Sequence, residues 1–146
     1  MALPEPVPGL VIRYSYLWRR EHERGQEEGV KDRPCAVVMV VGTDEGNRIV
    51  TVLPVTHTPP SDRALAIEIP YATKERLGLD SERSWVLLTE ANRFVWPGPD
   101  LRMKEPDGSP ESVAFGLLPR AFFKDIASKF ADAIERRLTR VVRRTQ

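Results

Sequence analysis

The sequence contains a single cysteine, Cys35, and only two histidines, His22 and His57. One cysteine excludes an internal disulfide and a zinc site built from several cysteines. The longest apolar run, residues 36–41, is far shorter than the roughly 20 residues that a transmembrane helix needs. Residues 1–8 contain no apolar stretch of the kind found in a signal peptide. These absences predict a cytoplasmic protein that meets no membrane.

The composition is that of a folded protein of modest size. The chain has 146 residues, of which 41% are apolar and 29% charged, a balance typical of globular domains. A chain of this length buries roughly two thirds of its unfolded surface, so it needs no disulfide or metal to fold. We therefore expect one domain spanning residues 1–146, with no cofactor and no metal site.

The charge is almost balanced at +1, but it is unevenly distributed. Residues 113–146 contain eight basic and three acidic residues, so the remainder of the chain is acidic. The excess is concentrated near the C-terminus, at Arg136, Arg137, Arg140, Arg143 and Arg144. Such a tail suits a phosphate backbone or an acidic partner, or it complements the negative end of a helix dipole.

Short segments rich in β-branched and apolar residues fill most of the chain, and each predicts a strand. They span residues 11–16, 35–41, 49–55, 65–69, 84–89 and 94–96. Turn residues at 42–47 predict a hairpin between the second and third segments. Residues 18–31, 57–62 and 96–110 are expected to be loops because they are polar or rich in proline and glycine.

The last residues change character, because apolar side chains recur there at intervals of three and four. They are Phe123, Ile126, Phe130, Ile134, Leu138 and Val141. This spacing is one face of an amphipathic helix, expected over about 119–144. Many short strands followed by one helix predict a mainly β fold, a small β-barrel over about 8–118 or a strongly bent sheet, with the helix packed on it.

Eight short motifs follow one another along the chain. They are PGLVI at 8–12, RGQE at 24–27, DRPCAVV at 32–38, VLPVT at 52–56, GL at 78–79, SWVLL at 84–88, NR at 92–93 and FGLL at 115–118. This ordered set resembles the MazF/PemK/Kid family of bacterial toxins. The resemblance implies an SH3-like barrel with a terminal helix. It also implies a homodimeric, metal-independent endoribonuclease that cuts single-stranded mRNA through the 2′-hydroxyl and is silenced by a cognate antitoxin protein.

The resemblance assigns catalytic roles to Arg33, Thr56 and Arg93, and places Gln26 and Glu27 in a substrate-binding loop. An arginine suits the crowded phosphorane because its planar fork pairs two phosphoryl oxygens and stays charged. The alternative for Arg33 is an ordinary salt bridge with a neighbouring carboxylate. The Thr56 hydroxyl can hold a phosphate oxygen or the 2′-hydroxyl, or it can bond its own turn.

Two positions depart from the family pattern. His57 stands where many members have serine, and a histidine there can act as general acid or base near neutral pH, or it is an inert loop residue. Val95 stands where some members have aspartate, which leaves Asp100 as a substitute and Glu90 as a second one. Trp96, at a loop edge, is a candidate to stack an unpaired base, or it packs between barrel and helix.

A second function remains open. The same barrel could serve as a non-catalytic, PemK-like module that binds nucleic acid or protein for regulation. The acidic balance of the residues before the helix and the missing aspartate favour this alternative.

Overall fold

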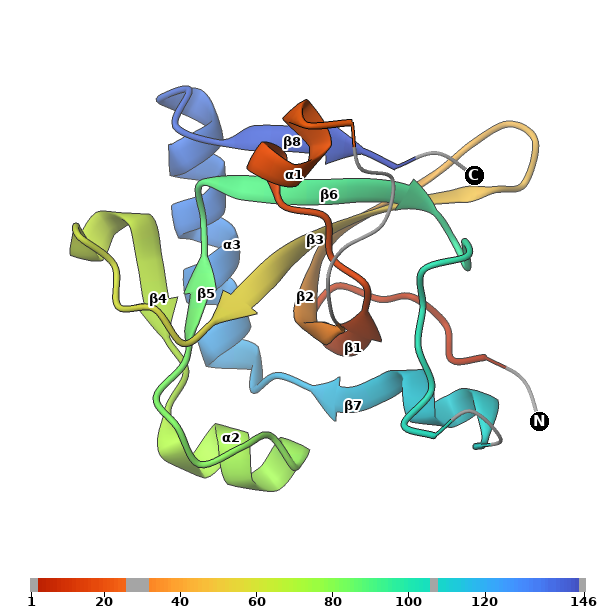
Figure 1. The fold of residues 1–146 in the computed structure, drawn as a ribbon, viewed down its shortest axis with the longest axis horizontal. Helices are drawn as coiled ribbons and strands as arrows, with labels where there is room; N and C mark the ends of the chain where they lie inside the picture. The colour runs from red at the N-terminus through yellow and green to blue at the C-terminus, as the bar shows by residue number, and fades with distance from the viewer. Residues whose placement is uncertain (1–2, 26–31, 106–107, 145–146) are drawn as a thin grey trace.

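The computed structural model describes residues 3–25, 32–105 and 108–144 (Figure 1). Among them lie eight strands and three α-helices. The strands are β1 (Leu10–Tyr14), β2 (Arg33–Gly42), β3 (Arg48–Thr56), β4 (Ala66–Glu68), β5 (Trp85–Leu87), β6 (Glu90–Val95), β7 (Ala114–Leu117) and β8 (Arg140–Arg143). The helices are α1 (Arg19–Glu23), α2 (Tyr71–Leu77) and α3 (Arg120–Glu135). The predicted mainly β class is confirmed.

All eight strands belong to one sheet, and β3 is its centre. On one side β3 pairs antiparallel with β2; on the other its first half pairs with β6 and its last two residues with β5. The sheet continues from β2 through β1 to β7, and from β5 to β4. The edge strands β4 and β7 have only three and four residues, and no pairing among the described strands joins them. The sheet is therefore not closed into a barrel, so the predicted SH3-like barrel is not observed, whereas a sheet with a packed helix is.

The hairpin between β2 and β3 follows the prediction. Its turn is closed by a hydrogen bond from the Thr43 amide to the Asn47 carbonyl (2.9 Å). Gly46 has a φ of +82°, a conformation that favours glycine. The turn thus fixes the register in which Val41 lies opposite Ile49.

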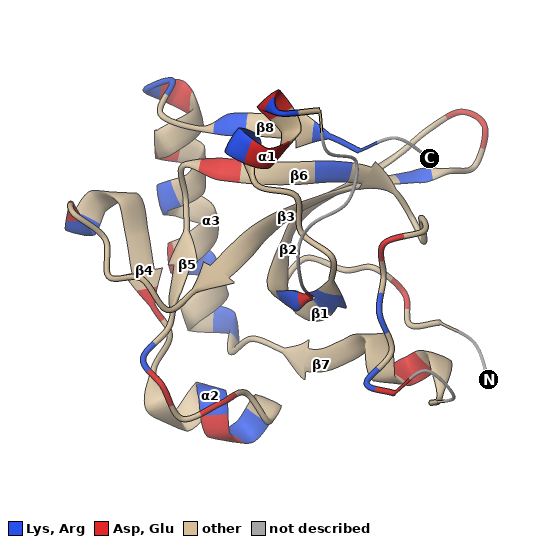
Figure 2. Cartoon of the chain, in the orientation of Figure 1, with Lys and Arg blue, Asp and Glu red and all other residues tan. Residues whose placement is uncertain are grey.

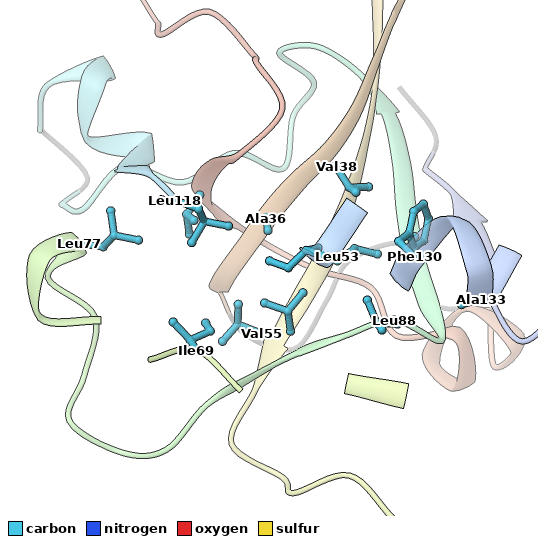
Figure 3. Packing of buried hydrophobic residues seen from close by; sticks show 14 residues of the cluster. Ala36, Val38, Leu53, Val55, Ile69, Leu77, Leu88, Leu118, Phe130 and Ala133 are labelled. Atoms are coloured by element: carbon cyan, nitrogen blue, oxygen red, sulfur yellow. The ribbon is translucent and has the colours of Figure 1, made fainter. Parts of the chain in front are cut away.

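The core occupies both faces of the sheet. On one face α3 packs Ile126, Phe130 and Ala133 against Leu53 and its neighbours (Figure 3). On the other face a second cluster contains aromatic and aliphatic side chains, among them Tyr14, Tyr16, Val37, Phe94 and Trp96. The continuous apolar run of β2 predicted burial on both faces; this holds for Cys35, Ala36, Val37 and Val38, but Met39 and Val41 further along the strand are exposed. No helix in the described part of the chain has the length and apolar character that crossing a bilayer requires.

The C-terminal segment differs from the prediction of a helix over 119–144. α3 ends at Glu135, Arg137 has a φ of +59°, and β8 then pairs in parallel with β6. The physical reason is burial. In the strand conformation the Val142 side chain of β8 is buried, and the side chain of the following Arg144, which is 1% exposed, forms an ion pair with Asp100 (3.0 Å). A continued helix would forgo both. The tail is therefore part of the sheet and does not project beyond the core.

Candidate functional site

Two hollows flank the C-terminal end of β3, because side chains alternate between the two sides of a strand. Val55 and His57 line a hollow of about 170 Å³, which we call the Arg33 hollow. Thr56 and Thr58 line a hollow of about 500 Å³, which we call the Trp18 hollow. The Arg33 hollow is also lined by Asp32, Arg33, Pro34, Leu79, Asp80 and Ser84. The Trp18 hollow is also lined by Trp18, Arg19, Arg20, Glu23, Pro59, Pro60, Leu87 and Glu90.

Arg33 lies at the first position of β2, and its guanidinium carbon is 4.7 Å from the centre of the Trp18 ring. Its Nε is buried and has no hydrogen-bond partner among the described residues. The neighbouring Asp32 carboxylate instead faces Arg102, at 3.5 Å from its Nε. Arg33 therefore lies against the Trp18 ring and lines the hollow, and a guanidinium in such a place is suited to pair with an anion.

His57 follows β3 and lies against a carboxylate. Its Nε2 is 2.8 Å from Asp80 Oδ2, and Asp80 Oδ1 accepts a hydrogen bond from Nζ of the buried Lys74 (2.7 Å). Burial acts to raise the pKa of Asp80, but the hydrogen bonds from Lys74 and His57 outweigh it and lower that pKa. Asp80 is thus an ionised group that orients the imidazole, a pairing found in acid–base catalysis.

Glu82 completes a group that bears on metal binding. His57, Asp80 and Glu82 offer donor atoms within 4.8 Å of one another, the one such group in the part of the chain that the structure describes. All three are exposed. The Lys74 ammonium already forms an ion pair with Asp80 and so places a positive charge beside this group. The arrangement is therefore better suited to proton transfer by His57 than to holding a cation.

The Trp18 hollow contains Thr56, which is half-buried and accepts a hydrogen bond from the Thr58 amide at Oγ1 (3.1 Å). This is the turn bond foreseen as the alternative role of Thr56. Glu90 is held in the same hollow by the Tyr16 hydroxyl (3.2 Å) and the Arg19 amide (3.0 Å), both on Oε1. Burial raises the pKa of Glu90 even though these hydrogen bonds oppose the rise.

Arg93 does not join these residues. It lies on β6 opposite Thr51 of β3, five positions before Thr56, a separation of roughly 17 Å along the strand. Its neighbour on the other side is Arg143 of β8. The structure thus brings Arg33 and His57 into one hollow, places Thr56 in the adjacent one, and leaves Arg93 apart.

The remaining residues predicted for the site lie away from the two hollows or outside the residues that the structure describes. Asp100 is buried in its ion pair with Arg144, and Trp96 is buried with its ring 6.1 Å from that of Phe94. Neither side chain presents a free polar edge or ring face to a hollow beside β3. Gln26 and Glu27 lie outside the described residues.

Asp80 and Trp18 are residues that the sequence interpretation missed. Asp80 follows the GL motif, but its pairing with His57 spans 23 residues of chain, and no local spacing reveals it. Trp18 was assigned to a polar loop, yet it lines the Trp18 hollow and has the Arg33 guanidinium over its ring. The sequence feature that could have pointed to Trp18 is the spacing of Tyr14, Tyr16 and Trp18, aromatic residues at every second position as in a half-buried strand.

Comparisons with family models, with curated proteins and with solved structures found no match to this chain. The resemblance to MazF, PemK and Kid rests on the short motifs alone. The functional argument is therefore made from the geometry of the two hollows.

Proposed function

We propose that this protein is a metal-independent endoribonuclease that cuts single-stranded RNA through the 2′-hydroxyl, as the toxin of a type II toxin–antitoxin system. The observation that carries the proposal is the Arg33 hollow. There Arg33 lines the same hollow as His57, a histidine held by the ionised carboxylate of Asp80. These are the two kinds of group that RNA cleavage without a metal requires.

In the proposed reaction the 2′-oxygen attacks phosphorus and the bond to the 5′-oxygen breaks. With Nε2–H donating to Asp80, the Nδ1 atom of His57 can accept the 2′ proton, and the protonated ring can return a proton to the leaving 5′-oxygen. Arg33 donates to the non-bridging oxygens, where negative charge develops. The products are a 2′,3′-cyclic phosphate and a 5′-hydroxyl end.

The proposal includes the surroundings of the enzyme. The protein acts in the cytoplasm as a homodimer and is silenced by a cognate antitoxin protein. Its fold is a distorted, open form of an SH3-like barrel. Met39 and Val41, which are 45% and 49% exposed on β2, support the dimer because exposed apolar patches favour association.

A non-catalytic module that only binds RNA or protein is the second candidate. The observation in its favour is the dispersal of the expected site, since Arg93 lies apart from Arg33 and the Asp100 carboxylate is engaged by Arg144.

One experiment separates the candidates. Purified protein is incubated with mixed-sequence single-stranded RNA in EDTA, and the cut ends are mapped. We expect cleavage to survive chelation and to stop when the scissile nucleotide is 2′-deoxy, because the 2′-oxygen is the nucleophile. Cleavage that disappears in EDTA and returns with magnesium would contradict the mechanism. RNA that is bound but not cut would support the binding module.

A further inference from the structure

The Trp18 hollow has the lining of a nucleotide site. Its volume of about 500 Å³ lies within the usual range for small-ligand pockets. One part of the wall is apolar, formed by Trp18, Pro59, Pro60 and Leu87. The other part is polar, formed by two threonines, two arginines and two glutamates. The apolar part of such a wall can stack a flat ring, and its polar side chains can form hydrogen bonds with the edge of that ring. The arginines at the rim can contact a negatively charged group of the ligand.

The Trp18 indole is held firmly. Tyr16 packs edge-on against it, with ring centres 5.1 Å apart. The Arg33 guanidinium lies over it at 4.7 Å, yet Arg33 lines the other hollow. The indole therefore belongs to the Trp18 hollow and also contacts a residue of the Arg33 hollow. A ring stacked on Trp18 would lie next to the proposed cleavage site.

Glu90 presents a fixed carboxyl edge to the hollow. Its Oε1 is anchored by the Tyr16 hydroxyl and the Arg19 amide. Its Oε2 has no hydrogen-bond partner within the described residues. A carboxylate oxygen in this position accepts from the amino groups of bases, as glutamate does with cytosine N4.

Basic side chains surround the rim. Arg19 and Arg20 belong to α1, which packs against β8. Figure 2 shows basic positions on α1 and on the neighbouring β8. Arg19 is paired with Glu23 (2.7 Å), whereas Arg20 is exposed and has no ion-pair partner in the described part of the chain. Arg20 is thus free to meet a phosphate.

We propose that the Trp18 hollow binds one unpaired nucleobase of the RNA beside the scissile phosphate. Trp18 stacks the base, Glu90 selects bases that carry an amino group, and Arg20 contacts the attached phosphate. The inference rests on the proposed function for its substrate. An acidic peptide would also meet Arg20, but Glu90 would repel it and the indole would have no planar partner.

The test uses ligands that cannot be cleaved: AMP, CMP, UMP and adenosine, titrated into the intact protein. Quenching of tryptophan fluorescence reports binding, because Trp18 is more exposed than the buried Trp85 and Trp96, and calorimetry gives the affinity. We expect AMP and CMP to bind more tightly than UMP. Trp18→Ala weakens AMP binding by about fivefold or more, the lower end for loss of base stacking.

Two further variants test the other roles. Glu90→Gln reduces the preference for CMP over UMP, because the amide also offers a donor. Arg20→Ala weakens AMP binding but leaves adenosine, which has no phosphate, unchanged. Tyr71→Ala and Arg120→Ala are the matched controls, since both remove exposed side chains that line neither hollow. Trp18→Phe, which retains a ring, gives an intermediate affinity and covers the case in which Trp18→Ala fails to fold.

The outcomes distinguish this inference from the proposed function. Equal AMP affinities for Trp18→Ala and Tyr71→Ala would overturn the base site, even if Arg33-dependent cleavage is observed. Nucleotide binding that depends on Trp18, Glu90 and Arg20 without any RNA cleavage would retain the base site and reject the nuclease. Binding that depends on Arg20 alone, and that an acidic peptide matches, would replace the nucleobase with a protein partner.

Discussion

At the residue scale, Arg33 lies against the Trp18 ring and lines the Arg33 hollow. Its buried Nε has no hydrogen-bond partner among the described residues, which is uncommon in folded proteins. Its backbone belongs to β2, which is buried from Cys35 to Val38, so the side chain starts from a rigid strand. Pre-organised charge of this kind acts on the transition state without reorganisation.

Arg33→Ala should therefore slow RNA cleavage by at least about 10² while leaving the melting temperature nearly unchanged. The variant removes a charge at the phosphate but no hydrogen bond from Nε to the described protein. Initial rates and a thermal melt measure the two effects. Arg63→Ala, which removes an exposed arginine lining neither hollow, is the control. An unchanged rate would remove Arg33 from the site.

In the proposed mechanism Asp80 acts through His57, whose Nε2 it contacts, so it would be a positioning residue. Asp80→Asn should lower kcat by at least about tenfold with little change in KM, because general acid–base catalysis contributes about 10²–10⁴. Asp80→Glu, which keeps the charge, should restore part of the rate. Thermal melts of both variants show whether the fold is kept. An equal rate loss in both variants, accompanied by an equal fall in melting temperature, would indicate a structural role alone.

The same substitution predicts a change in stability with pH. The lowered pKa of Asp80 means that its ion pairs stabilise the fold above the usual carboxyl pKa of about 4, and that this contribution is lost as the pH falls through the lowered value. Asp80 is half-exposed, so the effect is small because of solvent screening. Denaturation of Asp80→Asn at pH 7 and pH 3 should show a weaker acid dependence than that of the unmodified protein.

At the scale of elements, local patterns were sufficient for some segments and insufficient for others. The β2–β3 hairpin and the start of α3 follow from turn residues and from the spacing of apolar side chains. β8 does not, because Leu138 and Val141 continue the helical spacing, and only the distant partners Asn92 and Asp100 make a strand more favourable. The candidate site shows the same division, since the motifs pointed to Arg33 and Thr56 as candidates but not to Asp80, whose contact with His57 spans 23 residues.

The buried end of β8 should be critical for folding. Arg144→Ala would remove the ion pair with the buried Asp100 carboxylate and the hydrogen bonds that Arg144 donates to the Ser15 carbonyl and to Asn92 Oδ1. Breaking such a pair costs about 3–5 kcal/mol of unfolding free energy. The neighbouring exposed residue provides the control, because Arg143→Ala should change stability by about 0.5 kcal/mol or less. Urea denaturation measures both, and equal effects would contradict the anchoring role of Arg144.

At the scale of the whole molecule, the open sheet leaves edges and an apolar face to be covered. β4 and β7 are short edge strands, which limits uncontrolled strand pairing. β2 differs, because Met39 and Val41 lie two residues apart and present exposed apolar side chains on the same side of the strand. This part of β2 is therefore where we expect a second molecule to make contact.

We therefore expect a homodimer at micromolar concentration, measured by light scattering. Met39→Glu should shift the mass toward that of the monomer, because a charge buried in an apolar contact without a partner is costly. Tyr71→Ser is the control: it changes a side chain that is 65% exposed on α2 and should leave the mass of the dimer unchanged. A monomer mass for the unmodified protein would contradict the dimer. A dimer that tolerates Met39→Glu would place the interface elsewhere, and the edge strand β7, where Leu117 is exposed, would be the next surface to substitute.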